Sequence, residues 1–292
     1  MGLTQGAVLG YLQSLRKSGK FSEVIAYYAA RPGHIMLENY SIKREIVICY
    51  EKLGEIKLAA QVASSLLDED AAAKTYQALI RYSESCSKIL KIINQIDDQN
   101  LPLKWKSDDR PERIANKQGG WRKFLVMPIS YSLPQVMMLG HINQLGNLCG
   151  GLFDIGCGMG FFVFAASRFF SFDVSGCEIE LENNIWFKKC WEELGVEDLI
   201  SEYRVPKSGP LLLPPRTQYV VAHLPTFNLG WDLSEYLGFV SELSKHQSVE
   251  RLLLFPNPLN AKQEKINFRQ FLARGSYCSD TNIATWHMNK FR

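Results

Sequence analysis

The segment that decides the fold spans residues 151–170 and reads GLFDIGCGMGFFVFAASRFF. Its first five residues form a short apolar run that is typical of a buried strand, and residues 161–170 form an apolar run long enough for a helix. Between the two runs, glycine occupies positions 156, 158 and 160. Glycines at this spacing allow a tight turn with positive φ angles and let a ligand lie against bare backbone. The segment therefore predicts a strand, a turn and a helix that hold a nucleoside-bearing cofactor.

The spacing of the glycines separates two classes of cofactor. A dinucleotide-binding turn has the pattern G-x-G-x-x-G, and its third glycine would fall at position 161, which holds Phe161. The chain therefore lacks the dinucleotide pattern. A second strand-like run, residues 172–178, follows the helix and ends in the carboxylate of Glu178. Strand, turn, helix, strand and terminal acid thus occur in order within about 30 residues, the size of one βαβ unit.

Residues 154–160 match the pattern D-x-G-x-G-x-G and resemble the cofactor loop of class I S-adenosylmethionine-dependent methyltransferases. The resemblance implies a doubly wound, Rossmann-like α/β sheet and S-adenosylmethionine as the cofactor. It also implies that Glu178 binds both ribose hydroxyls, which the two oxygens of a carboxylate can accept. The candidate cofactor-binding residues are Asp154, Gly156, Cys157, Gly158, Gly160, Glu178 and Ile179.

Length and composition fit a globular protein of two domains. The chain has 292 residues, of which 46% are hydrophobic and 22% charged, and its net charge of +3 does not favour a nucleic-acid partner. Its seven cysteines are an odd number and form no C-x-x-C pair, which indicates free thiols in a reducing compartment. Because the chain shows neither a secretory signal nor an apolar run of about 18 residues, we expect a cytoplasmic protein without a membrane span.

Residues 7–95 have helical periodicity and few glycines or prolines, which predicts an all-helical domain at residues 1–97. Residues 11–21 and 46–56 look like copies of one unit, with Gly19 and Gly54 35 positions apart. This spacing is close to the 34-residue period of tetratricopeptide repeats, which the second copy resembles. We expect a third, degenerate helix pair at residues 70–95. The alternative is a plain antiparallel helical bundle.

The rest of the chain divides into a junction and an α/β domain. Residues 98–123 contain prolines, a pair of glycines and many charges, which indicates a linker or a lid, and residues 124–292 form the methyltransferase-like domain. Strand and helix patterns alternate along this domain, and we expect the ligand across the carboxyl ends of the strands of a doubly wound sheet. The expected helices are 132–145, 181–194, 232–245 and about 263–273. The expected later strands are 199–205, 218–222 and 250–255, with a terminal antiparallel pair.

His223 is the candidate catalytic residue, because it is the first polar residue after the expected strand 218–222. A neutral imidazole, whose reference pKa is about 6.5, can serve as a general base. The alternative is that His223 only hydrogen-bonds a loop carbonyl or the cofactor. Enzymes that methylate base amino groups or glutamine often carry (Asp or Asn)-Pro-Pro-(Tyr or Phe) at this position. Residues 223–226 depart from that motif at three of four places, which disfavours those substrates.

Other candidate features are weaker. Phe227, Trp231 and Tyr236 could wall an acceptor pocket, although aromatic residues at this spacing are more often part of a core. The acidic residue that closes the third strand in the family, and binds the adenine amino group, has no clear counterpart between Leu199 and Lys207. The histidines and acids show no metal-ligand spacing, so we predict no metal.

These observations favour a methyltransferase that moves a methyl group from S-adenosylmethionine to a hydroxyl or amine of a small molecule or glycan. The helical N-terminal domain would serve as a platform for substrate or for a protein partner. The alternative function is an interaction protein whose helical repeats bind partners and whose methyltransferase-like domain is degenerate and non-catalytic. A nucleic-acid substrate is disfavoured by the low net charge.

Overall fold

The computed structural model describes residues 4–95, 122–146, 148–178, 185–206, 209–223, 232–255, 270–278 and 283–291. The chain divides into two compact units, Met1–Val136 and Met137–Arg292. The linker or lid expected at residues 98–123 lies outside the described residues except for its last two positions, which begin α8 (Arg122–Val126). The linker and the domain boundaries drawn from it therefore stay predictions.

The first unit begins with two helical hairpins of equal dimensions. Helices α1 (Gln5–Lys17) and α3 (Tyr40–Lys52) have 13 residues each, and α2 (Phe21–Ala29) and α4 (Ile56–Ser64) have nine each. A short 3-10 helix, η1 (Ile35–Glu38), connects the hairpins. The turns hold Gly19 and Gly54 at φ angles of +75° and +79°, a left-handed conformation that favours glycine. The predicted spacing thus recurs in the structure, while membership of the tetratricopeptide family stays a prediction.

The third, degenerate helix pair expected at residues 70–95 is wrong. This segment is one continuous helix, α5 (Glu69–Gln95), with 27 residues. It contains no glycine or proline that would interrupt the backbone hydrogen bonds of a helix. Its start is capped by Asp68, whose Oδ1 accepts a hydrogen bond from the backbone N–H of Ala71 at 3.0 Å. Helix α5 packs against α4 and α8 within the first unit.

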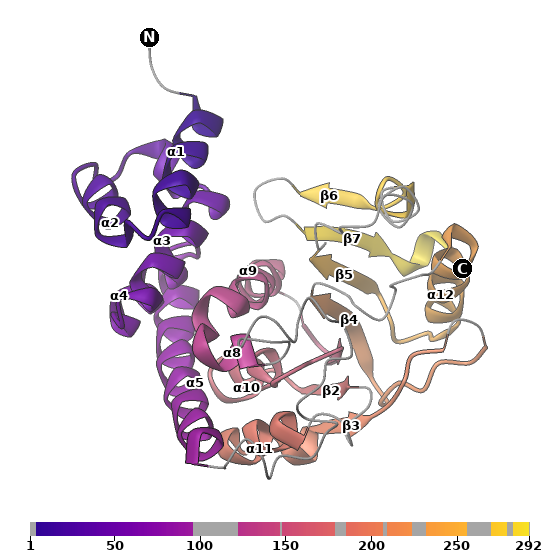
Figure 1. The fold of residues 1–292 in the computed structure, drawn as a ribbon. Coiled ribbons are helices and arrows are strands. Elements are labelled where there is room, and N and C mark those ends of the chain that lie inside the picture. The colour runs from indigo at the N-terminus through magenta and orange to yellow at the C-terminus, as the bar shows by residue number, and fades with distance from the viewer. Residues whose placement is uncertain are drawn as a thin grey trace. The chain divides into compact units, whose positions relative to one another are not determined.

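The second unit is built on a seven-stranded sheet with the order β3-β2-β1-β4-β5-β7-β6 (Figure 1). Strands β1 to β5 pair in parallel, β7 pairs antiparallel with β5, and β6 pairs antiparallel with β7. The predicted α/β sheet and its terminal antiparallel pair are confirmed. The strands are β1 (Gly151–Ile155), β2 (Val174–Glu178), β3 (Ile200–Glu202), β4 (Thr217–His223), β5 (Arg251–Phe255), β6 (Ser276–Cys278) and β7 (Ile283–His287).

Helices cover both faces of this sheet. Helix α12 (Leu233–Lys245) packs its Phe239 into a core with Val220 of β4, and the ring of Phe162 in α10 (Phe161–Arg168) lies against His223 on the opposite face of β4. Figure 1 shows α12 and α10 on either side of the sheet. Asp232, the first residue of the helix expected at 232–245, is the N-cap of α12 and forms a capping box with Glu235. The remaining elements are α11 (Ile185–Leu194), η3 (Glu197–Leu199) and η4 (Met288–Lys290).

Helix α9 (Pro128–Leu145) begins about one turn earlier than the helix expected at residues 132–145, so Pro134 lies inside it and not in its first turn. The reason is a distant side chain: Glu51 of α3 accepts hydrogen bonds from the backbone N–H groups of Ile129 and Ser130. These N–H groups have no partner within the helix itself. No described helix is both long and apolar enough to cross a membrane.

Candidate functional site

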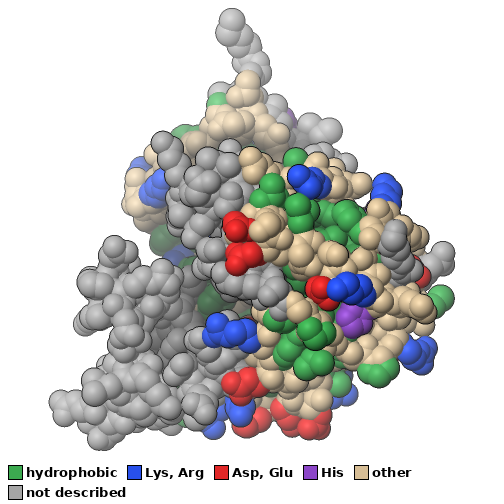
Figure 2. Space-filling model, turned by 90° about the vertical axis from the view of Figure 1, so that its right-hand side faces the viewer, with side chains coloured by type: hydrophobic (Ala, Val, Ile, Leu, Met, Phe, Trp, Pro, Cys, Tyr) green, Lys and Arg blue, Asp and Glu red, His purple; other side chains and the backbone are tan. Residues whose placement is uncertain are grey.

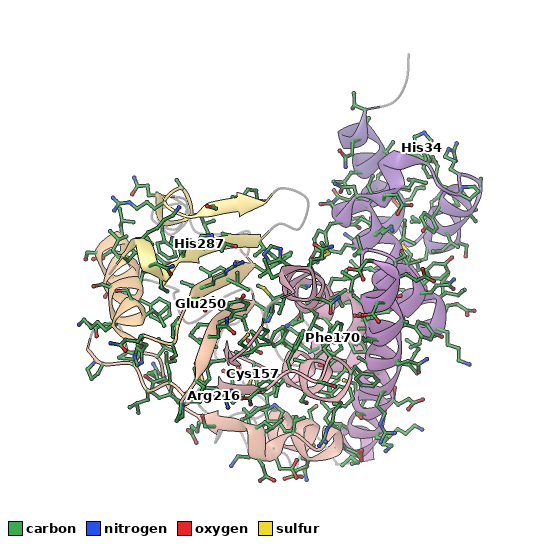
Figure 3. The ribbon with its side chains drawn as sticks, turned by 180° about the vertical axis from the view of Figure 1, so that it is seen from behind. His34, Cys157, Phe170, Arg216, Glu250 and His287 are labelled. Atoms are coloured by element: carbon green, nitrogen blue, oxygen red, sulfur yellow. The ribbon has the colours of Figure 1, made fainter. Side chains whose placement is uncertain are left out.

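The turn between β1 and α10 has the backbone that its glycines predict. Gly156, Gly158 and Gly160 have φ angles of +73°, +54° and +83°, all in the left-handed region. Among the described residues, no atom lies within 4 Å of a Cβ atom placed on Gly156 or Gly158, so both positions border open space. Cys157, between them, is labelled in Figure 3. Bare backbone beside open space is the surface that a nucleoside ligand can approach closely.

Gly160 has a different reason to be glycine. A Cβ atom there would lie 2.8 Å from Cδ1 of Trp191 and 3.3 Å from Cδ1 of Ile200. The indole of Trp191, in α11, packs directly on the turn, and its Nε1 donates a hydrogen bond to the carbonyl of Gly158 at 2.9 Å. In the sequence, Trp191 is only one of the apolar residues of the helix expected at 181–194. Gly160 is the sequence feature that could have indicated this role, because a glycine at that position leaves room for a large side chain packed on the turn.

Glu178 ends β2 beside the same turn. Its Oε2 accepts a hydrogen bond from the backbone N–H of Gly158 at 2.7 Å. The turn is also attached to β2 through the carbonyl of Cys177, which accepts from the N–H groups of Gly156 at 2.9 Å and Cys157 at 3.1 Å. The structure thus brings the glycine turn and the expected ribose-binding acid together at the carboxyl ends of β1 and β2. Their roles in cofactor binding stay predictions.

Two other expected cofactor contacts have different outcomes. Ile179 lies outside the described residues. Cys157 is buried, and burial, followed by the nearby carboxylates of Asp154 and Glu178, raises the pKa of its thiol well above the usual range. The thiol is therefore uncharged at neutral pH, and we expect Cys157 to contribute its backbone to a ligand.

Asp154 and His223 form a buried pair behind the turn. Asp154 is in register with Val221 of β4, so that the side chains of Asp154 and His223 lie on the same face of the sheet. The distance from Nε2 of His223 to Oδ1 of Asp154 is 3.6 Å, and each side chain is 1% exposed. The Phe162 ring covers the imidazole with a centroid distance of 4.6 Å. His223 is the last residue of β4 and not the first residue after it, because β4 pairs with β5 through His223 and Phe255.

The carboxyl of Asp154 is in an unusual environment. Both of its oxygens are buried, and neither has a hydrogen-bond partner among the described residues. Burial is the main cause that raises the pKa of Asp154 well above its usual range, and the charge of Glu178 raises it further.

The third strand ends in an acid that the sequence reading overlooked. Strand β3 stops at Glu202, three residues before the expected end at Val205, and Glu202 is in register with Glu178 of β2. The expectation that no acidic residue closes this strand is therefore wrong. The side chain of Glu202 is exposed at the edge of the sheet that holds the glycine turn.

The aromatic residues considered for an acceptor pocket are only partly described. Phe227 and Trp231 lie outside the described residues. Tyr236 is 2% exposed and stacks on Phe271 with a centroid distance of 4.9 Å, so it belongs to the core under α12. Within the described part of the chain, no three His, Cys, Asp or Glu residues are grouped to hold a metal ion.

Several solved structures are distantly similar to the chain. No family model and no curated protein matches the chain. A solved magnesium protoporphyrin IX methyltransferase from Synechocystis PCC 6803, with bound S-adenosylmethionine, is 19% identical over 63% of this chain and 88% of its own, with a TM-score of 0.38. A mitomycin 7-O-methyltransferase is 12% identical over 96% of this chain and 94% of its own, with a TM-score of 0.39.

The chain spans about half of a third structure, a glycopeptide N-methyltransferase complexed with S-adenosylhomocysteine. That protein is 19% identical, and the match covers 40% of this chain and 47% of the other, with a TM-score of 0.32. Scores of this size assign neither an activity nor a substrate to the chain.

Proposed function

We propose that the second unit binds S-adenosylmethionine at the carboxyl ends of β1 and β2 and transfers its methyl group to a hydroxyl or amine of a small molecule or glycan. The observation that carries the proposal is the turn at residues 156–160, with three left-handed glycines beside Glu178. The open space at Gly156 and Gly158 fits a ligand lying on the backbone. When bound, S-adenosylmethionine supplies an electrophilic methyl group on a sulfonium.

Each group of the turn has a task in this proposal. The carboxylate of Glu178 has two oxygens, which suit the two neighbouring hydroxyls of a ribose. Trp191 holds the turn in place through Gly158 and Gly160, so that the ligand surface is rigid before binding. A preformed surface reduces the entropy lost on binding and aligns the reacting groups, and alignment can lower a barrier by several kcal/mol.

His223 is the proposed general base. It ends β4, at the edge of the sheet to which the glycine turn also belongs. Its ring would take the proton that the acceptor hydroxyl or amine loses as the new bond to carbon forms. Burial of the ring excludes bulk water, which would compete for the same proton.

Isothermal titration calorimetry with S-adenosylhomocysteine tests the cofactor site. We expect micromolar binding by the wild type, no binding by Gly158→Arg, because a long side chain would fill the open space, and weaker binding by Glu178→Ala. The matched control is Glu250→Ala, which removes an exposed carboxylate just before β5, at the opposite ends of the parallel strands (Figure 3). A folded wild-type protein that binds no S-adenosylhomocysteine would refute the proposal.

A second candidate function is an interaction protein whose helical unit binds a protein partner. The observation that favours it is the equal length of the two helical hairpins at an offset of 35 residues, as in repeat proteins that stack such units. A folded protein without cofactor binding would support this alternative.

Charge and cysteine chemistry add two further points. On the face drawn in Figure 2, the described basic side chains are interspersed with acidic ones, which does not favour a nucleic-acid surface there. In the part of the chain that the structure describes, six of the seven cysteines carry free thiols, which supports a reducing compartment such as the cytoplasm. They are Cys49, Cys86, Cys149, Cys157, Cys177 and Cys190.

A further inference from the structure

We infer that Asp154 is a positioning residue for His223: its carboxylate accepts the Nε2 proton of the imidazole, and the other ring nitrogen, Nδ1, takes the proton of the methyl acceptor. The inference rests on the proposed function and adds to it a residue that had been expected only to contact the cofactor. It makes the pair, and not His223 alone, the unit that accepts a proton.

The positions of Asp154 and His223 are the first support for this pairing. Asp154 is the penultimate residue of β1, His223 is the last residue of β4, and the two side chains share one face of the sheet. Nε2 is the ring nitrogen that faces the carboxyl, at 3.6 Å from Oδ1. A small movement of the ring would bring this distance into the hydrogen-bond range of about 2.7–3.2 Å. The packing of Phe162 on the imidazole restricts other ring orientations.

The buried carboxyl of Asp154, which lacks a hydrogen bond within the described part of the chain, is the second support for the pairing. The two oxygens of Asp154 are buried without a hydrogen bond among the described residues, and a buried carboxylate is costly unless a donor or a positive charge compensates it. The imidazole of His223 is the nearby group that can supply both. A carboxyl beside a histidine fixes its tautomer and stabilises the imidazolium that forms when the ring takes up a proton.

The charges around the pair set the direction of its titration. Among the described residues, the titratable groups that act with Asp154 are Glu178 at the end of β2 and the thiols of Cys157 and Cys177. Burial raises the pKa of Cys177 to about 12, so this thiol is uncharged at neutral pH. From α10 the uncharged ring of Phe162 packs on His223, and on β5 the uncharged Phe255 is its register partner. Burial and the nearby charge of Glu178 disfavour a negative charge on Asp154, so a proton on the Asp154–His223 pair is favoured.

In the reaction, the acceptor O–H or N–H bond breaks and its proton moves to Nδ1 of His223. The electron pair of the acceptor atom forms the new bond to the methyl carbon, and the bond from that carbon to sulfur breaks, with its electrons remaining on a neutral thioether. The imidazole becomes an imidazolium, whose charge the Asp154 carboxylate balances. Atoms and charges are conserved without a further reactant.

Nitrogen NMR of protein labelled with ¹⁵N-histidine tests the inference without an acceptor. The His223 signals are identified by their loss in His223→Gln. We expect the neutral imidazole of the wild type to carry its proton on Nε2. In Asp154→Asn, we expect the pH midpoint of the His223 titration to fall by about 1–3 units, the usual effect of removing an opposite charge at this range. The matched control is Asp173→Asn, an exposed acid just before β2, which should leave the midpoint unchanged.

Two results would overturn the inference: a proton on Nδ1 in the neutral wild-type ring, or the same midpoint in Asp154→Asn and wild type. The first result needs no variant, so the test stands even if Asp154→Asn does not fold. The titration uses protein without cofactor, whereas the proposed function fails if calorimetry detects no S-adenosylhomocysteine binding. The two failures are therefore distinguishable.

Discussion

The raised pKa of the buried Glu51 side chain predicts that the stability of the protein depends on pH. Its side chain is buried in the first unit, where Oε1 accepts from the N–H of Ile129 at 2.7 Å and Oε2 from that of Ser130 at 3.0 Å. These hydrogen bonds, and more weakly Lys52, favour the charged form, but burial outweighs them and raises the pKa of Glu51 to about 7. Glu51 thus accepts hydrogen bonds from two backbone N–H groups at the start of α9, while burial makes its charged form unfavourable.

The sign of the effect follows from proton linkage. The pKa of Glu51 is about 7 in the folded protein against an ordinary value of 4.5, so between these pH values the folded state binds more protons than the unfolded state. The free energy of unfolding therefore falls as the pH rises through this window, and the loss is complete above pH 7. At about 1.4 kcal/mol per pH unit, the difference corresponds to about 3 kcal/mol.

Glu51→Gln removes the charge and keeps the shape of the side chain. One amide oxygen can replace one carboxylate oxygen, but the NH₂ group faces the second backbone N–H, which loses a hydrogen bond worth about 1–2 kcal/mol. We expect the variant to be less stable than the wild type near pH 5. We expect it to gain about 3 kcal/mol relative to the wild type by pH 8, because the charge penalty is absent.

Urea unfolding followed by circular dichroism at a series of pH values measures this difference, and hydrogen exchange of the Ile129 and Ser130 amides reports it locally. Glu55→Gln is the matched control, because Glu55 is exposed and its side chain does not cap α4. A stability difference between Glu51→Gln and wild type that stays constant from pH 5 to pH 8 would refute the reasoning.

Four other substitutions have defined outcomes. Gly160→Ala should lower the free energy of unfolding by about 2–3 kcal/mol in thermal melts, because the residue has a φ of +83° and its new Cβ atom would lie 2.8 Å from Trp191. Gly158→Ala, with a φ of +54° beside open space, should lower the free energy of unfolding by only about 1 kcal/mol. Trp191→Phe removes the hydrogen bond to Gly158, and calorimetry should show S-adenosylhomocysteine binding weakened about 5-fold; unchanged affinity would separate this residue from the turn. Asp232→Ala removes the capping box of α12 and should cost about 1 kcal/mol in urea unfolding, with no change in cofactor affinity.

Local features of this protein could be predicted from the sequence because their causes lie within a few residues. The strand at residues 151–155 and the start of the helix at Phe161 are confirmed at the predicted positions. The helix expected at residues 232–245 is also confirmed, with Asp232 as its N-cap directly before Leu233. The hairpin turns at Gly19 and Gly54 follow from the backbone freedom of glycine.

The sequence by itself therefore determined the α/β sheet, the glycine turn and the acid that follows it, since these depend on short-range patterns of apolar residues and glycine. Only the tertiary structure decided which distant groups meet. It placed Glu51 at the start of α9, Trp191 on Gly160, and Asp154 beside His223. Strand register and helix packing set these contacts, and both depend on the whole chain burying its apolar surface together.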